Sequence, residues 1–231
     1  QSWLASLLRH PAAARLRVDP PIMKILLIED QAELVRTLPV GMTVTSALNA
    51  MAHAAEGLYA QNRSPISTLM ALEGLRAFRD GLPNVMANPH DLTARGETLY
   101  GAWLCGTVLG QVGMALHHKL CHTLGGSFDL PHAETHTVIL PHALAYNAPA
   151  VPEAMARIAT ALGGSSAAQA VFDLARDNGA PVALRDIGMK EADLDRACEI
   201  AMSNQYPNPR PLEAGAIRRL LQDAFEGRRP G

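Results

Sequence analysis

Aromatic residues are scarce in this 231-residue sequence, at 4%, whereas hydrophobic residues make up 48% and charged residues 18%. An apolar fraction of this size can build a buried core, which excludes wholesale disorder. Alanine and leucine dominate, and both favour helices, whereas the β-branched residues that favour strands are sparse. The composition therefore predicts a mainly α-helical globular fold.

Excess charge and paired cysteines are also lacking. The net charge is −2, and no basic patch is present, so we expect no nucleic-acid partner. The three cysteines, Cys105, Cys121 and Cys198, are far apart and form no CxxC motif. This argues against a disulfide framework or a structural zinc site and favours a reducing cytoplasm. The first residues show no pattern of a secretory signal, so we expect none.

Several catalytic motifs are absent as well. There is no HExxH and no GxSxG, so neither a zincin protease nor a serine hydrolase is supported. Residues 99–116 carry no charge, which raises the alternative of a membrane span. Because this stretch contains Gln111 and several glycines and leads into His117, we predict instead a buried helix, capped by Asp91 and ending near His117.

The chain divides at about residue 33. In residues 1–33, positions 23–30 read as a short buried strand ending in two acids, which resembles the start of a receiver domain. No α/β sheet follows, so a junction remnant or the last strand of a cofactor domain is favoured. Residues 34–231 form the predicted helical domain. Thr43, Thr45 and Ser46 are predicted to cap a helix running to about residue 61. Ser67 is predicted to start a second helix that runs through Arg79, with Gly81 and Pro83 marking its end.

Further along the chain, Gly125-Gly126 predicts a turn and Pro131 the start of another helix. Amphipathic helices are expected at about 152–162, 165–178, 190–203 and 212–226. The prolines at 207, 209 and 211 form a break before the last one.

Histidines are unevenly distributed, since six of the nine lie between residues 117 and 142. His118 and His122 are four residues apart and share one helix face, as do Asn49 and His53 on an earlier helix. With His132 after the loop, these helices would surround a pocket with four imidazoles and one amide. Such a set can bind a divalent metal or donate a proton. The alternative is that each histidine is a hydrogen-bonded core residue, which is the better interpretation for any one of them but not for the set.

Two segments carry a family resemblance. Residues 113–132 and 38–56 resemble the two signatures of the iron-containing alcohol dehydrogenases, which share a dehydroquinate synthase-like fold. Residues 101–106, 117–119, 131–136 and 206–211 resemble the maleylacetate reductase branch in particular. The resemblance covers about residues 34–231. It implies the multi-helical C-terminal domain of that fold, with the N-terminal α/β cofactor domain largely missing, because residues 1–40 contain no Gly-rich loop for a pyrophosphate.

The resemblance also implies site residues. In the metal-dependent relatives an Asp and three His hold the ion, and the matching positions here are Asn49, His53, His118 and His132. An amide is a weaker ligand than a carboxylate, so a metal is doubtful, and His53, His118 and His132 would hold it if present. The expected catalytic residues are His122 or His118 as the acid, with His53 and His132 as substrate or oxyanion contacts. The expected substrate-binding residues are Asn49, His117 and Lys119.

The resemblance therefore implies an oxidoreductase that reduces the double bond of 2-maleylacetate to 3-oxoadipate with NADH or NADPH, in aromatic compound degradation. The expected partner is this small dicarboxylate, and a homodimer is implied by the family. Two alternatives stay open: a metal-dependent alcohol dehydrogenase of the same family, and a non-catalytic helical fragment without its cofactor domain.

Overall fold

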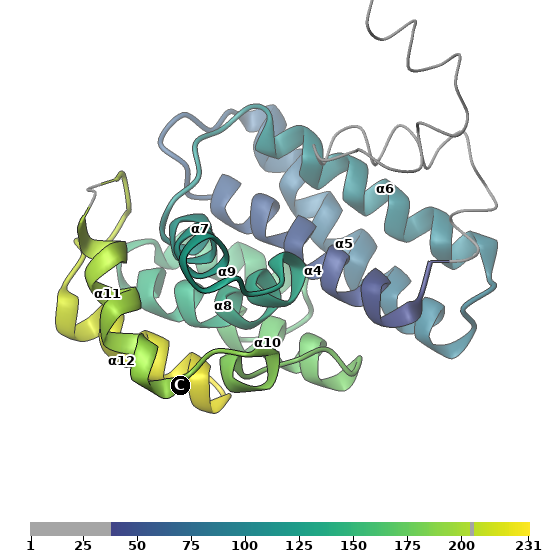
Figure 1. The fold of residues 1–231 in the computed structure, drawn as a ribbon. Helices are drawn as coiled ribbons and strands as arrows, with labels where there is room; N and C mark the ends of the chain where they lie inside the picture. Colours follow the sequence, from purple (N-terminus) through teal and green to yellow (C-terminus); the bar gives the residue numbers. More distant parts are fainter. Residues whose placement is uncertain (1–37, 204–205) are drawn as a thin grey trace, which may run out of the picture.

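The structure, a computed structural model, describes residues 38–203 and 206–231. Within these ranges every regular element is a helix, which confirms the predicted mainly α-helical class (Figure 1). The predicted strand at residues 23–30 and the proposed boundary at residue 33 lie outside the described residues. None of the described helices is long and apolar enough to cross a membrane.

The first three helices pack side by side. They are α4 (Val40–Gly57), α5 (Pro65–Ala87) and α6 (Leu92–Leu109), and α5 lies along α6 (Figure 1). The close approach of α5 and α6 requires small residues, because a Cβ on Gly74 would lie 2.6 Å from the sulfur of Cys105. The first hydrophobic core forms between these helices, with Leu48, Leu75 and Phe78 buried at its centre.

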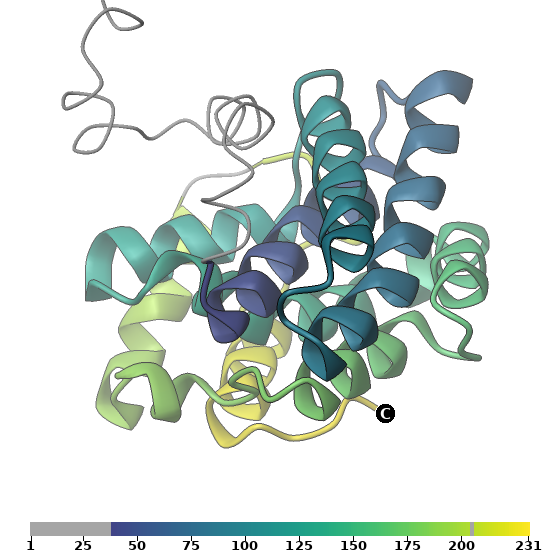
Figure 2. The same ribbon diagram turned by 90° about the vertical axis from the view of Figure 1, so that its right-hand side faces the viewer.

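A second group of helices follows. It contains α7 (Leu116–Phe128), α8 (His132–Asn147), α9 (Pro152–Ala161), α10 (Ala167–Asp177), α11 (Leu194–Ser203) and α12 (Ala214–Glu226), with short 3₁₀ turns at Ala148–Ala150, Leu184–Ile187 and Glu191–Asp193. Figures 1 and 2 show α11 and α12 lying together on one side of the molecule. Helix α8 contributes to both cores: Leu140 and Leu144 pack in the first and Ile139 in the second.

Two predicted helix starts are wrong by a few residues. Helix α4 begins at Val40, after Pro39, and not at a threonine cap. Thr43 and Thr45 lie inside the helix, where their hydroxyls donate to carbonyls four residues earlier. Helix α5 begins after Ser64, whose side chain accepts from the Ser67 amide in a reciprocal capping box.

The predicted helix ends differ more from the observed ones than the predicted starts do. Pro83 lies inside α5 and does not end it, and Gly125-Gly126 lies inside α7 and not in a turn. The turn comes at Asp129, which takes the left-handed conformation with φ 54°. The predicted long helix from Asp91 to His117 is wrong, because α6 ends at Leu109 and α7 starts at Leu116. The predicted helix starting at Pro131 is confirmed within one residue, and so are the four later helices within a few.

The break between α6 and α7 has a physical cause far away in the sequence. The Asn62 side chain donates to the Gln111 carbonyl at 3.3 Å and accepts from the Gly113 amide at 2.9 Å. These two bonds satisfy backbone groups that would otherwise bond within a continuing helix. The break turns the chain so that α7 starts beside α4, and this places the histidines of α7 next to His53 of α4.

Candidate active site

One face of α4 carries three polar residues at i, i+4 and i+7: Asn49, His53 and Glu56. His53 is 6% exposed and Glu56 is fully buried. A buried carboxylate is costly unless it accepts several hydrogen bonds. The structure shows that Glu56 accepts three good ones, all from the start of α7.

The carboxylate of Glu56 caps the beginning of α7. Its oxygens accept from the backbone amides of Ala115 and His117, each at 2.8 Å, and from Nδ1 of His118 at 2.7 Å. No side chain adjacent in sequence caps this helix. Amides at a helix start favour negative charge, so Glu56 of α4 does what a local N-cap residue would otherwise do. Burial alone would raise the pKa of Glu56, but the bonds from His118 and Ala115 lower it below its usual value, so Glu56 is a carboxylate.

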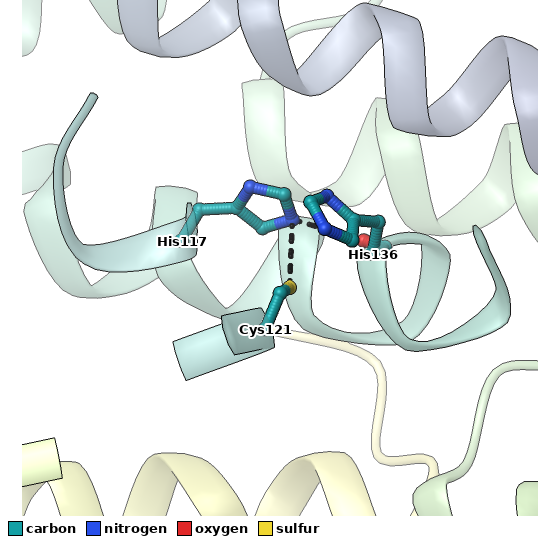
Figure 3. A group of neighbouring side chains, drawn as sticks. All are labelled: His117, Cys121 and His136. Atoms are coloured by element: carbon teal, nitrogen blue, oxygen red, sulfur yellow. Dashed lines mark hydrogen bonds between the residues drawn. The ribbon is translucent and has the colours of Figure 1, made fainter. Parts of the chain in front are cut away.

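His117 points away from this carboxylate into the contact between α7 and α8. Figure 3 shows its ring beside His136 and Cys121. Nε2 of His117 lies 3.1 Å from the backbone oxygen of His136 and 3.4 Å from the sulfur of Cys121. Because a carbonyl oxygen only accepts, Nε2 of His117 carries the ring proton and Nδ1 does not.

The imidazoles form a continuous cluster. His118 stacks on His53 with ring centroids 5.1 Å apart, and the His136 ring lies 5.2 Å from that of His118. His132 lies 4.2 Å from His136, and His122 lies 6.2 Å from His118. His53, His118 and His136 are buried, whereas His122 and His132 are exposed. The cluster therefore runs from the interior to the surface.

Several buried polar atoms of this cluster lack a hydrogen-bond partner among the described residues. They are Oδ1 of Asn49, Nδ1 of His53, Nε2 of His118 and both ring nitrogens of His136. Each such atom costs on the order of 1–3 kcal/mol if it stays unpaired. Native proteins leave few of these groups unsatisfied, and a cluster of them marks a place where a ligand or water binds. The geometry thus indicates a polar binding site between α4, α7 and α8.

Two buried imidazoles of this site, those of His53 and His136, have lowered pKa values and are neutral near neutral pH. Burial, reinforced by repulsion from His118 and His117, lowers the pKa of His53 to about 3. Burial and the neighbouring imidazoles lower the pKa of His136 further still. The pKa of His122 is lowered as well, by the partial burial of its ring and by repulsion from His118 and His132. Since the imidazoles repel one another's charge, a bound anion would favour their protonation.

In the described residues, the ligand atoms of His53, His118 and His132 do not all lie within 4.8 Å of one another. Within the described part of the chain, two groups of three ligand residues have their ligand atoms within 4.8 Å of one another, and the set of His53, His118 and His132 is neither of them. The two groups are His117–Cys121–His136 and Glu56–His117–His118. In the first, the nitrogen of His117 that faces the sulfur carries a proton. In the second, the short bond between Glu56 and His118 holds a proton where an ion would lie. These residues do not fit a bound metal as they stand, and that Asn49 weakens metal binding stays a prediction.

The structure brings His53, His118, His122 and His132 into one cluster, as their spacing indicates. The other expected substrate contacts lie differently. His117 is fully buried behind His118, and the ammonium of Lys119 lies 5.6 Å from the centre of the Tyr206 ring.

Sequence reasoning did not single out Glu56 or His136. Both follow a signal in the sequence, because Glu56 continues the i, i+4, i+7 face of Asn49 and His53, and His136 stands four residues after His132.

The helical fold and the histidine site define a class of protein, and a comparison with protein families identifies it. Residues 43–225 match the model of the Fe-containing alcohol dehydrogenase family, C-terminal part. The chain belongs to this family.

The most informative relatives are maleylacetate reductases. The chain is 63% identical over 198 residues to maleylacetate reductase of Pseudomonas sp. strain P51, which covers 86% of this chain and 56% of that protein. The crystal structure of maleylacetate reductase from Rhizobium sp. strain MTP-10005 is 58% identical, with a TM-score of 0.84, over 86% of this chain and 57% of that one.

A more distant similarity is to the iron-containing alcohol dehydrogenase from Corynebacterium glutamicum, at 42% identity and a TM-score of 0.80, over 86% of this chain and 56% of that one. These similarities confirm the expected branch and the expected C-terminal helical fold. The chain spans about half the length of the relatives that it matches.

Proposed function

We propose that this chain forms the substrate-binding part of a maleylacetate reductase, which reduces the carbon–carbon double bond of 2-maleylacetate to give 3-oxoadipate. The carrying observation is the cluster of unpartnered buried polar atoms on Asn49, His53 and His118. The relatives at 63% and 58% identity are named maleylacetate reductases, which supports this reaction. NADH or NADPH, when bound, supplies the hydride.

The residues of this chain have separate roles in the proposal. His53 and His132 lie at opposite ends of the imidazole cluster, one buried and one exposed, so together they can contact both ends of a dicarboxylate. The Asn49 amide adds a neutral group that can either donate or accept. A carboxylate at position 49 would repel a dianionic substrate, whereas an amide does not.

The proton that completes the reduction comes from a histidine. His122 is exposed, so it exchanges protons with water, and its ring lies 6.2 Å from that of His118. Of the two expected candidates for general acid, His122 is therefore the one that can take up its proton from water. Imidazole N–H groups aimed at the substrate oxygen would stabilise the negative charge that develops there after hydride transfer.

Binding of 2-maleylacetate to this chain tests the proposal, with isothermal titration calorimetry as the measurement. We expect wild-type protein to bind, and His53→Gln to bind at least tenfold more weakly, because it removes a buried imidazole of the site. His142→Gln is the matched control, since His142 is also a buried histidine but lies in α8, outside the imidazole cluster. Equal affinities for wild type and His53→Gln would contradict the assignment of the site.

The cellular setting is part of the same proposal: a cytoplasmic homodimer. Cys105, Cys121 and Cys198 are all free thiols, which supports a reducing compartment. Sedimentation equilibrium of the purified protein tests the dimer, and a monomer at micromolar concentration would contradict it.

A further inference from the structure

Glu56 lies behind the ring of His118, on the side away from the unpartnered Nε2. We propose that Glu56 is a positioning residue, which selects the tautomer of His118 that has its proton on Nδ1 and its lone pair on the unpartnered Nε2. The catalytic relevance of this role rests on the proposed function, but the role itself is a property of the protein without ligand.

Glu56 and His118 form a short, buried hydrogen bond. Oε2 of Glu56 lies 2.7 Å from Nδ1 of His118, and both groups are buried. An ionised carboxylate has no hydrogen to give, so the hydrogen of this bond must belong to His118. The alternative tautomer would place a lone pair of nitrogen against a carboxylate oxygen at this distance, without water to screen the repulsion.

A second ring, that of His117, also lies next to Nδ1 of His118. Nδ1 of His117 lies 3.4 Å from Nδ1 of His118, so His117 could in principle supply the hydrogen between them. It does not, because the His136 carbonyl oxygen holds the proton of His117 on Nε2. Two groups that only accept, the Glu56 carboxylate and the His136 carbonyl, therefore determine one proton arrangement for both rings.

The consequence concerns what binds at His118. Its Nε2 is buried and has no partner among the described residues. In the tautomer with its proton on Nδ1, the ring offers a lone pair at this point. A ligand group that brings an O–H or N–H to Nε2 is favoured, and a bare carboxylate oxygen is disfavoured there. The carboxylates of a dianionic ligand then belong at the other imidazoles of the cluster.

Glu56→Gln is the most specific perturbation of this arrangement. An amide has one accepting oxygen and one donating nitrogen. If the nitrogen takes the place of Oε1, it faces the backbone amide of His117; if it takes the place of Oε2, it faces the backbone amide of Ala115 and Nδ1 of His118. Each orientation leaves one backbone amide facing an NH₂ group, so we expect both to be populated. In the second orientation His118 moves its proton to Nε2 and accepts at Nδ1.

The experiment is NMR of the whole chain with ¹⁵N-labelled histidine, in which two-bond couplings show which ring nitrogen carries the proton. His118→Gln assigns the signals of His118 by removing them. We expect wild type to show the Nδ1–H form of His118, and Glu56→Gln to show a mixture in which the Nε2–H form is present. Two variants should keep the wild-type form: Tyr59→Phe, which removes a long 3.5 Å contact to Glu56 and a hydrogen bond with Asn147, and the exposed control Glu73→Gln.

The outcomes separate cleanly. An Nε2–H form of His118 in wild type would overturn the inference, and this holds even if Glu56→Gln does not fold. A folded Glu56→Gln variant, verified by circular dichroism, without any Nε2–H form of His118 would show that Glu56 does not set the tautomer. Neither measurement requires substrate, cofactor or turnover, so failure of the proposed reaction leaves this test intact.

Discussion

His142 of α8 makes the stability of this protein depend on pH. Its side chain is 4% exposed, and its Nε2 has no partner among the described residues. Burial lowers its pKa from 6.5 to about 4, against a smaller opposite effect of Asp223. Between these two values the unfolded chain binds a proton at this residue and the folded chain does not. The stability that depends on neutral His142 is therefore fully present above about pH 6.5 and is lost as the pH falls toward 4.

The magnitude follows from the two pKa values. At pH 5 the unfolded chain, in which His142 has a pKa of 6.5, is mostly protonated at this residue, whereas the folded chain, with a pKa of about 4, mostly is not. Lowering the pH from about 7.5 to about 5 therefore lowers the free energy of unfolding by about 2 kcal/mol. His142→Gln removes this titration and keeps a polar side chain of similar size. Wild type should therefore lose about 2 kcal/mol more than the variant over this pH range.

The assay is urea unfolding at both pH values, followed by circular dichroism. His90→Gln is the matched control, because His90 is exposed, and it should lose as much stability as wild type. Comparing the two pH values within each protein cancels any change in packing that the substitution itself causes. If His142→Gln showed the same loss as wild type, the buried neutral state of His142 would be refuted.

Three further substitutions test other parts of the structure. Arg95→Met removes three hydrogen bonds of the buried guanidinium, so it should cost about 2–4 kcal/mol in urea unfolding, whereas the exposed Arg76→Met should cost less than about 0.5 kcal/mol. Gly74→Ala should cost about 1–3 kcal/mol by wedging α5 from α6, and adding Cys105→Ala should restore part of the loss; no restoration would disprove the contact. Asn49→Asp should raise the affinity for Zn²⁺ and weaken binding of 2-maleylacetate, both measured by calorimetry; if neither changes, the charge argument for Asn49 fails.

The helices that sequence could locate are those whose ends depend on local chemistry. The α8 helix starts after Pro131, and α9 after Val151 with Pro152 in its first turn, because proline suits the first turn of a helix. The break between α6 and α7 depends instead on Asn62, about 50 residues earlier in the chain. Local patterns contain no information about such a bond, so the uncharged run was interpreted as one helix.

The site shows the same division. Spacing of four residues places Asn49 with His53 and His118 with His122, and the structure confirms that the two helices bring their histidines together. The role of Glu56 depends on the direction in which α7 begins, which is a tertiary property. A carboxylate at the end of a helix face is more often solvated than buried, so only the structure distinguishes it.

Turnover tests the central claim most directly. The segment of the Pseudomonas sp. strain P51 reductase that this chain does not match would be fused before residue 34, and NADH absorbance followed with fresh 2-maleylacetate, with and without EDTA. We expect the fusion protein to oxidise NADH only when 2-maleylacetate is present. This activity should be lost in the same fusion protein carrying both His118→Gln and His122→Gln. A fusion protein that unfolds cooperatively, binds NADH and yet leaves 2-maleylacetate unreduced would contradict it.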